Sequence, residues 1–285
     1  MKRSDFRFLE PLRVRWAEVD LQKIVFNGHY LMYFDTAVAG YWRALAMPYH
    51  ETMEAMQGDL FVRKATLEYE ASARYDEQLA VGIRCTRIGN SSLAFAAAAF
   101  RGEQRLVHGE LIYVFADPAT QTSKLVPTVL RDWFMGFEAG EPMHQIQVGD
   151  WAALGADVSA IRQAVFVVEQ RIPADLVVDA VDPQALHAVA RNRLGLALAA
   201  GRLLPAREGV GQIGRMATLA SMRGARLGRA VLEALLSAAR ERGDREVMLQ
   251  AQTSAVSFYE RLGFVRRGAV FEDAGIPHQA MRRAP

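Results

Sequence analysis

Cysteine, excess charge and long apolar runs are all scarce in this chain, and each shortage excludes a class of protein. Cys85 is the single cysteine in 285 residues, so no disulfide forms within the chain, and we expect a reducing compartment. The formal net charge of +2 gives no support to a nucleic-acid partner. No uninterrupted apolar run approaches the roughly 18 residues of a membrane span, and no signal-peptide core follows the N-terminus. We therefore expect a cytoplasmic protein without nucleic-acid or membrane partners.

The length favours two domains, since a usual domain has about 100–200 residues. The chain is 51% hydrophobic and 23% charged, as is typical of globular domains with packed cores. Gly140-Glu141-Pro142 forms a natural joint, and we place the domains at 1–141 and 142–285. Cys85 falls in an alternating apolar run, which favours a buried and unreactive thiol.

The first half combines alternating stretches with one long apolar run. Residues 12–16 alternate apolar and basic side chains, which predicts a strand. Asn27-Gly28 precedes a helical run over 30–47, with Asn27 as the capping residue. Because that helix is apolar on every side, we expect a curled sheet to surround it. Further strands are predicted at 67–75, 79–85, 93–99 and 107–115, followed by a helix at 127–138.

Two segments of the first half, Val14-Arg15-Trp16-Ala17-Glu18-Val19-Asp20 and Ile24-Val25-Phe26-Asn27-Gly28-His29-Tyr30-Leu31, resemble the hotdog-fold acyl-CoA thioesterases of the YbgC-like, 4-hydroxybenzoyl-CoA thioesterase type. The resemblance implies that Asp20 acts as nucleophile or general base on the thioester. It also implies that backbone N–H groups from Gly28 to Tyr30 bind the acyl-CoA carbonyl as its oxyanion develops. His29 would either orient the carbonyl or a water, or make a hydrogen bond at the helix end.

Two features of this resemblance leave alternatives open. Many relatives carry His-Ala-Asn-Tyr where this chain has Asn27-Gly28-His29-Tyr30, so the polar pair is exchanged in order. Asp35 is the rival carboxylate, because another hotdog branch places its acid within the helix; its alternative role is to pair with a group of a partner chain. Since hotdog sites usually form between subunits, the resemblance implies a homodimer or homotetramer.

The second half alternates strands and helices. A short strand is expected at Ile146 and Val148, and a helix that begins near Asp157 or Ser159. Strands are predicted at 187–190, 196–204, 213–219 and 247–252; a helix is predicted from Leu227 to Gly243, and Ser254 is expected to cap a short helix with Tyr259.

The loop between the strand at 213–219 and the helix at Leu227 is rich in glycine and arginine. Gly224 and Gly228 let the backbone approach a ligand closely, and the unpaired N–H groups of a helix start can hold a pyrophosphate. Arg223, Arg226 and Arg229 add positive charge that matches phosphate oxygens. The loop therefore indicates a phosphate-binding site.

Three later motifs support that interpretation: Val247-Met248-Leu249-Gln250-Ala251-Gln252, Ser257-Phe258-Tyr259-Glu260-Arg261-Leu262-Gly263-Phe264 and Phe271-Glu272-Asp273-Ala274-Gly275-Ile276-Pro277-His278. With Phe166-Val167-Val168-Glu169-Gln170-Arg171 they resemble the GNAT superfamily of N-acetyltransferases, in its ElaA-like group. The resemblance implies that Tyr259 protonates the departing thiolate of coenzyme A. The implied cofactor-binding residues are Met216, Ala217, Thr218, Arg223, Gly224, Ala225, Arg226, Leu227, Gly228 and Arg229.

The sequence leaves two alternative roles open for some residues of this half. Arg226 stands where many family members have glycine, so a degenerate transferase is one alternative. Glu169 either binds or deprotonates an amine or is a surface charge, and His278 either lines the acceptor site or belongs to the final strand.

We predict an α+β hotdog domain, an antiparallel sheet wrapped around a central helix, followed by an α/β GNAT domain, a mixed sheet with flanking helices. The predicted function is bifunctional: hydrolysis of an acyl-CoA thioester, and acetyl transfer from acetyl-CoA to an amine. Acyl-CoA is a substrate, and no metal is expected. The alternative is an N-acetyltransferase whose hotdog domain only binds acyl-CoA or dimerises the chain.

Overall fold

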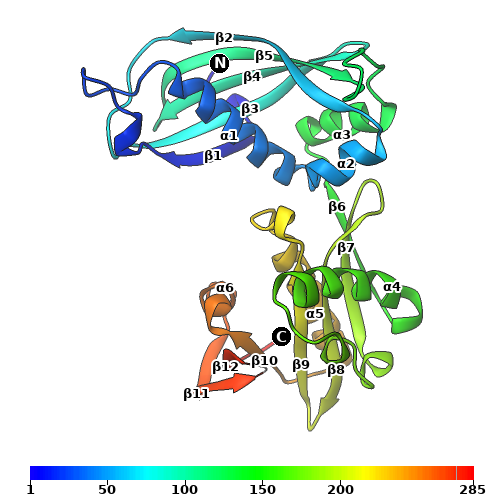
Figure 1. Cartoon of the computed structure of the whole chain (residues 1–285). Helices are drawn as coiled ribbons and strands as arrows, with labels where there is room; N and C mark the ends of the chain where they lie inside the picture. The colour runs from blue at the N-terminus through cyan, green and yellow to red at the C-terminus, as the bar shows by residue number, and fades with distance from the viewer. Residues whose placement is uncertain (274) are drawn as a thin grey trace. The chain divides into compact units, whose positions relative to one another are not determined.

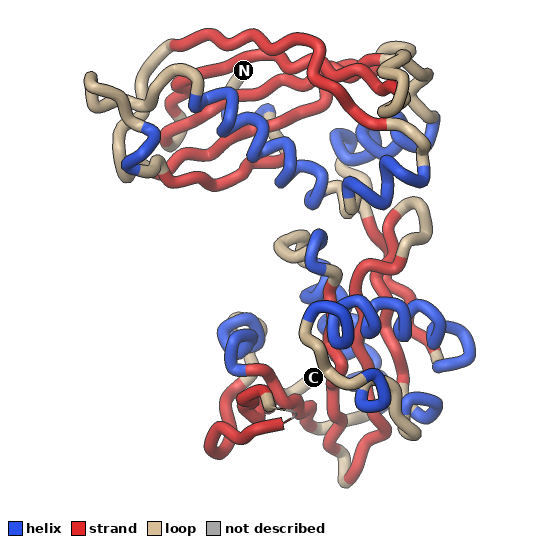
Figure 2. Tube along the Cα trace, in the orientation of Figure 1, coloured by secondary structure: helices blue, strands red, loops and turns tan. Residues whose placement is uncertain are grey.

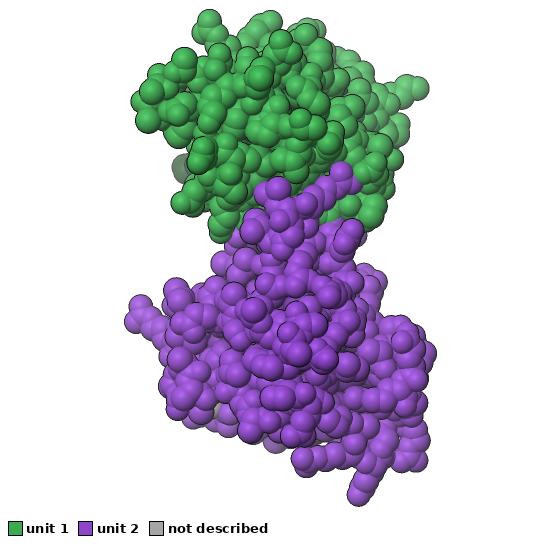
Figure 3. All heavy atoms as spheres, turned by 90° about the vertical axis from the view of Figure 1, so that its right-hand side faces the viewer, with its two compact units in different colours: residues 1–143 green, residues 144–285 purple. Residues whose placement is uncertain are grey.

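The computed structural model describes residues 1–273 and 275–285. Ala274, which belongs to the last motif quoted above, lies outside the described residues. The chain divides into two compact units, Met1–Met143 and His144–Pro285 (Figure 3). Each unit has its own sheet and its own core.

The first unit is an antiparallel sheet with one long helix along its face (Figures 1 and 2). Its strands are β1 (Phe8–Arg13), β2 (Asp59–Tyr69), β3 (Gln78–Ile88), β4 (Ser92–Arg101) and β5 (Gln104–Ala116), and its helices are α1 (His29–Ala44), α2 (Tyr49–Ala55) and α3 (Thr128–Ala139). The strand order is β1-β3-β4-β5-β2, with antiparallel neighbours throughout. The hotdog half of the predicted fold is confirmed.

The strand predicted at 12–16 is wrong, because β1 ends at Arg13. Trp16–Glu18 form a 3-10 turn, in which the Glu18 carboxylate accepts hydrogen bonds from the backbone N–H (2.7 Å) and side chain (2.5 Å) of Arg15. Trp16 is consequently 77% exposed. A local side-chain hydrogen bond therefore ends the strand that alternation alone would continue.

The strand predicted at 67–75 is also displaced, since β2 ends at Tyr69. Beyond it the N–H groups of Glu70 and Ala71 share one acceptor, the Leu106 carbonyl, so the ladder stops there. The predicted Asn27 cap is wrong as well. The N-cap of α1 is Gly28, without any side-chain cap.

Aromatic rings form the core between α1 and the sheet. Tyr41 of α1 packs on Phe95 of β4, with ring centroids 6.0 Å apart. The opposite face of β4 is covered by Phe6, which packs on Phe100 at 5.7 Å and on two β4 alanines. Because β4 is buried on both faces, its small alanines fit a strand. Cys85 is buried nearby, and burial raises the pKa of its thiol to about 12.

The other face of α1 is open in this single chain. Leu31 and Met32 are 41% and 37% exposed, and Asp35 and Ala39 are exposed beside them. The sheet covers only one side of the helix, so the expectation of a helix surrounded on every side is wrong for the isolated chain.

The second unit is a mixed sheet between helices. Its strands are β6 (His144–Gly149), β7 (Leu186–Asn192), β8 (Ala197–Arg207), β9 (Val210–Thr218), β10 (Glu246–Gln252), β11 (Val265–Asp273) and β12 (Ile276–Arg283), and its helices are α4 (Trp151–Arg162), α5 (Leu227–Arg242) and α6 (Val256–Glu260). The order is β11-β12-β10-β9-β8-β7-β6, in which β9 and β10 pair in parallel. The GNAT-like half of the predicted fold is confirmed.

Helices α4 and α5 cover opposite faces of this sheet. Ala200 of β8 belongs to the cluster under α4, whereas a Cβ on the next residue, Gly201, would meet Val231 and Leu235 of α5. Successive strand residues point to opposite faces, so the sheet is buried on both sides here.

Two predicted helix starts in this unit are wrong. Helix α4 begins at Trp151, because the Asp150 carboxylate accepts a hydrogen bond from the Ala153 N–H (2.9 Å) and caps it. The chain then continues into a π-helix at Gln163–Glu169. Ser254 does not cap α6, because it lies inside a 3-10 turn and the N-cap is Ala255.

Within residues 1–273 and 275–285, one helical stretch, Trp151–Glu169, has the length and apolar composition to cross a membrane. Leu154, Val158 and Ile161 of this stretch pack in a core cluster with strand residues of the second unit. A core helix of a folded domain has the same composition, so packing accounts for it.

Gly109 of β5 lies directly against the backbone of β2. A Cβ at this position would be 2.0 Å from the Thr66 carbonyl oxygen. We expect Gly109→Ala to lower the free energy of unfolding in urea by about 1–3 kcal/mol, because a strand must shift. Gly214→Ala is the control, since nothing lies within 4 Å of its added methyl group. Equal unfolding midpoints for both variants would contradict this close approach.

Candidate functional sites

The second unit contains a cavity of about 920 Å³. Its walls come from the π-helix, β9, the loop before α5, and the segment from β10 to α6. Among the predicted site residues, the lining includes Met216, Ala217, Thr218, Arg223, Gly224, Arg226, Leu227, Gly228, Arg229 and Tyr259. Ala225 does not line the cavity, and its N–H donates to the Met222 carbonyl (3.2 Å). The structure thus gathers nearly all of this set at one place.

The cavity exists because β9 and β10 separate. Within the described residues, the two strands pair only from Val210 with Glu246 to Gln212 with Met248. Beyond Gln212 the facing edge of β9 is unpaired and open to a ligand. Arg215, with φ +52°, lies at a register shift in the β8–β9 ladder. Such a bulge bends a strand, which helps β9 to leave its neighbour.

Free backbone donors gather at the start of α5. The N–H groups of Gly224, Arg226, Leu227, Gly228 and Arg229 make no hydrogen bond to any residue in 1–273 or 275–285, and the first helical bond runs from the Ala230 N–H to the Arg226 carbonyl (3.1 Å). Together with the helix dipole, these groups form a site suited to an anion with several oxygens.

Arg226 adopts a left-handed conformation, with φ +62°. Glycine takes this conformation freely, which explains why glycine would suit the position. A side chain there costs about 1–2 kcal/mol. Arginine at this position still adopts the left-handed turn, and its N–H makes no hydrogen bond within the described chain, so this donor stays available to a ligand.

Tyr259 of α6 lines the cavity, although its ring is largely buried. The ring packs on Phe258 and Phe264, with centroids 4.9 and 5.8 Å away. The residue is 8% exposed, and burial raises the pKa of its phenol to about 12. The phenol therefore keeps its proton at neutral pH and can donate it to an atom in the cavity.

The cavity also has residues to which the sequence assigned no firm role. Glu169, at the end of the π-helix, accepts two hydrogen bonds from Arg223 (2.7 and 2.6 Å), and these hold the pKa of its carboxyl below the ordinary value. The Gln252 side chain donates to Gln170 Oε1 (3.1 Å). No local sequence pattern predicts the π-helix, which places Glu169 and Gln170 at the cavity.

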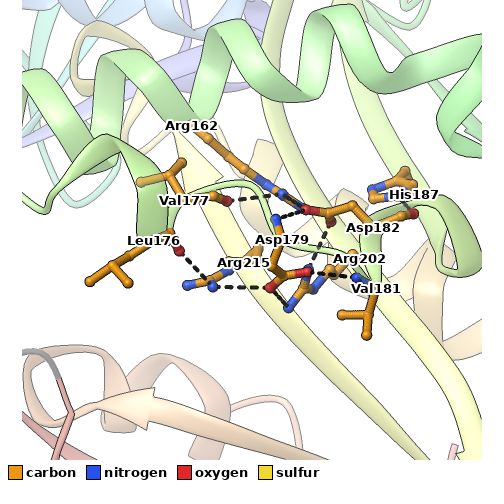
Figure 4. Close-up of polar contacts among 9 residues, drawn as sticks. All are labelled: Arg162, Leu176, Val177, Asp179, Val181, Asp182, His187, Arg202 and Arg215. Atoms are coloured by element: carbon orange, nitrogen blue, oxygen red, sulfur yellow. Dashed lines mark hydrogen bonds and ion pairs between the residues drawn. The ribbon is translucent and has the colours of Figure 1, made fainter.

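A largely buried ion-pair network joins α4, the segment at 173–185, β8 and β9 (Figure 4). Arg162 is fully buried and donates to Asp182 (2.8 Å) and to the Val177 carbonyl (3.2 Å). Arg202 donates to Asp179 (2.7 Å) and Asp182 (2.8 Å). Although burial opposes it, hydrogen bonds from Arg162 and Arg202 hold the pKa of Asp182 well below its ordinary value.

The same network reaches the bulge of β9. Arg215 donates to Asp179 (3.2 Å) and to the Leu176 carbonyl (2.8 Å). Arg215 immediately precedes Met216, the first cavity residue of β9. The network therefore anchors the strand where it begins to line the cavity.

In the first unit, a small hairpin links Asp20 to the start of α1. The Asp20 N–H donates to the Ile24 carbonyl and the Phe26 N–H to the Glu18 carbonyl, both at 2.9 Å, around a bridge between Val19 and Val25. The Asp20 carboxylate accepts only a local bond among the described residues, from the Gln22 N–H (2.8 Å).

Glu18 holds this hairpin to the helix, a role the sequence did not reveal. Its carboxylate is 3% exposed and accepts a hydrogen bond from the Tyr33 hydroxyl of α1 (2.7 Å). Because the hydroxyl lies 15 residues away in sequence, the motif itself gives no sign of the contact.

Backbone donors are also free at the start of α1. The His29 N–H donates to the Phe26 carbonyl (2.9 Å) and the Tyr30 N–H to the Asn27 carbonyl (3.3 Å), whereas the Gly28 and Leu31 N–H groups have no partner within the described chain. The Tyr30 side chain is buried, and its hydroxyl accepts from the Ala73 N–H (2.9 Å). The His29 ring packs on Phe26 at 5.9 Å.

The remaining candidates lie apart from these groups. Asp35 is exposed on the open face of α1. His278 lies in β12, opposite Gln252, and its Nδ1 bonds the Ile276 carbonyl (2.8 Å); it is not among the residues that line the cavity. No cluster of three or more His, Cys, Asp or Glu residues in the described chain is arranged to hold a metal.

Comparisons with known proteins match each half separately. The thioesterase superfamily matches residues 22–108, and the acetyltransferase (GNAT) domain matches residues 167–284. The uncharacterized N-acetyltransferase YjcF of Bacillus subtilis is 36% identical over 128 residues, which cover 45% of this chain and 90% of YjcF. The acyl-CoA thioester hydrolase YbgC of Escherichia coli is 27% identical over 124 residues, covering 42% of this chain and 90% of YbgC.

Solved structures resemble the second half as well. The crystal structure of Escherichia coli ElaA matches with a TM-score of 0.46 and 27% identity, over 50% of this chain and 99% of ElaA. The family matches define the class, which is a fusion of a thioesterase-like domain with an acetyltransferase-like domain. The chain belongs to the GNAT family through its second half, and its first half matches the thioesterase superfamily. Both resemblances predicted from the sequence are confirmed.

Because of the buried ion pairs, we expect the stability of the second unit to depend strongly on Asp182. We expect Asp182→Asn to destabilise the second unit by about 3–5 kcal/mol in urea, because Arg162 then remains buried without its anion and Arg202 keeps only Asp179. Since the folded pKa of Asp182 is depressed, its contribution should be complete above about pH 4 and shrink as the pH falls below that value.

Asp157→Asn is the matched control. Asp157 pairs with Arg191 at a partly exposed site, so its loss should cost no more than about 1 kcal/mol. Comparable losses for the two variants would contradict a special role for the buried network.

Proposed function

We propose that the chain is a bifunctional acyl-CoA enzyme that hydrolyses a thioester in the first unit and transfers an acetyl or other acyl group to an amine in the second. One observation carries the transferase half of the proposal: a single cavity combines an open β9 edge, free N–H groups at the start of α5 and a protonated buried phenol. The family matches support both activities. A cytoplasmic location and a reducing environment belong to the same proposal.

In the transfer reaction, the N–H groups before α5 bind the cofactor's pyrophosphate. The amides of its pantetheine arm pair with the open edge at Met216–Thr218 as an added strand. The amine nitrogen, in its neutral form, attacks the thioester carbonyl; the C–N bond forms, the C–S bond breaks and the proton released by nitrogen passes to solvent. Tyr259 gives its proton to the departing sulfur, which leaves as a thiol, and the phenolate regains a proton from solvent.

Tyr259→Phe removes this proton without emptying the core. We expect kcat for acyl transfer to fall by about 10²–10⁴ while the affinity for coenzyme A stays within about twofold. Calorimetry and steady-state kinetics measure the two quantities. Phe258→Leu is the control for packing beside the ring. A Tyr259→Phe enzyme with unchanged kcat would rule out the proton donor.

In the hydrolysis reaction, Asp20 either activates the water that attacks the thioester carbonyl or attacks it directly, giving a mixed anhydride that water then hydrolyses. The Gly28 N–H stabilises the oxyanion, the C–S bond breaks, and the thiol leaves with a proton that comes from the water. The open face of α1, with Leu31 and Met32 exposed, and the long edge strand β2 support burial against a second copy. We therefore include a homodimer or homotetramer in the proposal, with His29 beside the reacting carbonyl.

Free-thiol release from a panel of acyl-CoAs without any amine tests this half. We expect Asp20→Asn to abolish release, and Gly28→Pro to lower kcat by about 10²–10³, because proline lacks the N–H. The φ of Gly28 is −65°, which proline also adopts. Gly28→Ala is the matched control that keeps the donor.

The Asp35→Asn variant separates the rival carboxylate from Asp20. Loss of release in Asp35→Asn alone would transfer the catalytic role to Asp35. Acyl-CoA binding without any turnover by the folded protein would favour the alternative, in which the first unit is a binding or dimerisation module.

A further inference from the structure

Glu169 and Arg223 form an ion pair across the cavity of the second unit. Arg223 lies in the loop before α5, and Glu169 ends the π-helix, another segment of the cavity wall. Two parallel hydrogen bonds of 2.7 and 2.6 Å join the guanidinium to both carboxylate oxygens. The pair therefore links the loop that carries the free N–H groups to the end of the π-helix.

The charges around the cavity are unevenly distributed. Glu169 is the single carboxylate among the described lining residues, whereas Arg223, Arg226, Arg229 and Arg261 all line it. This one carboxylate forms an ion pair with Arg223. A cationic ligand therefore finds no free anion there until the ion pair opens.

The pair is also easy to open. The Glu169 and Arg223 side chains are 37% and 48% exposed, and ion pairs at such exposure contribute little to stability. Arg223 lies next to the free N–H groups of Gly224 and Arg226. A phosphate bound there carries more charge than a carboxylate and offers a bidentate acceptor of the kind that arginine prefers.

We propose that Arg223 exchanges Glu169 for a cofactor phosphate, and that the released Glu169 carboxylate binds the acceptor amine as its ammonium ion, which loses a proton to solvent before its nitrogen attacks the thioester. The acceptor class is then a primary alkylamine that is cationic at neutral pH. The inference rests on the proposed acyl transfer. It makes Glu169 a specificity residue that becomes available when the acyl donor is bound.

Titration of the full-length protein with coenzyme A tests the exchange. Glu169→Gln should bind coenzyme A about three- to fivefold more tightly than the wild type, because no ion pair has to open. In an Arg223→Gln background the same Glu169→Gln substitution should change the affinity by less than about 1.5-fold. Unchanged or weaker binding by Glu169→Gln overturns the exchange.

Glu260→Gln is the control for general charge. Glu260 pairs with Arg266 and lies beside Tyr259, but it does not touch Arg223. Removing its charge should leave the affinity within about 1.5-fold, because exposed charges are screened. An increase equal to that of Glu169→Gln would mean that net charge alone is responsible, and the exchange would be overturned.

n-Butylamine titrated into the coenzyme A complex tests the amine. We expect millimolar binding to the wild-type complex and at least fivefold weaker binding to the Glu169→Gln complex. No binding to the wild-type complex, or equal binding to both, overturns the assignment of Glu169 to the amine. Failure of the wild type to bind coenzyme A at all would instead defeat the proposed transferase function itself.

Discussion

The second unit depends on the interruption of the β9–β10 ladder. A sheet normally satisfies every backbone group of an internal strand, and β9 is internal in the sheet order. After Gln212 it nevertheless leaves its neighbour, and the open edge and the free N–H groups before α5 face one cavity. The fold therefore holds unsatisfied donors and acceptors that a chain-like anionic ligand can satisfy together.

The ion-pair network maintains this interruption. A bulge with a left-handed arginine is unfavourable alone, and Arg215 is stabilised there by Asp179 and the Leu176 carbonyl. Asp179 is in turn held by Arg202 of the neighbouring strand, and Asp182 ties Arg202 to Arg162 of α4. Helix packing, the loop at 173–185 and the shape of β9 are thus mechanically connected. The cost of burying these charges is offset because each carboxylate accepts several hydrogen bonds.

Local sequence signals predicted the elements whose boundaries are set locally. The helix from Leu227 to Gly243 is one example, because Gly243 adopts the left-handed cap conformation (φ +87°) that glycine favours. Where several residues give equivalent signals, the predicted boundary was wrong. Asp150, Asp157 and Ser159 are all good caps, and the helix uses Asp150, whose carboxylate accepts the Ala153 N–H. The β1 boundary failed for another reason, a hydrogen bond from Arg15 to Glu18 that alternation does not register.

In the candidate sites, too, the features set by local sequence could be predicted, whereas those set by tertiary contacts could not. The loop before α5 could be recognised because its glycines and arginines are contiguous. The β9 bulge, the π-helix and the contact between Tyr33 and Glu18 could not, because each joins residues that are distant in sequence or depends on tertiary packing.

Both units present free backbone N–H groups at a helix start, but in different arrangements. At α1 the turn consumes the donors of His29 and Tyr30, and those of Gly28 and Leu31 stay without a partner in the described chain. At α5 the left-handed Arg226 turns the chain so that donors on both sides of it stay free, and the free donors run consecutively from Arg226 to Arg229. Separate donors suit a charge that develops on a single carbonyl oxygen, whereas a consecutive cluster suits a pyrophosphate with many oxygens. The turn geometry before each helix therefore sets which kind of negative charge each proposed site can hold.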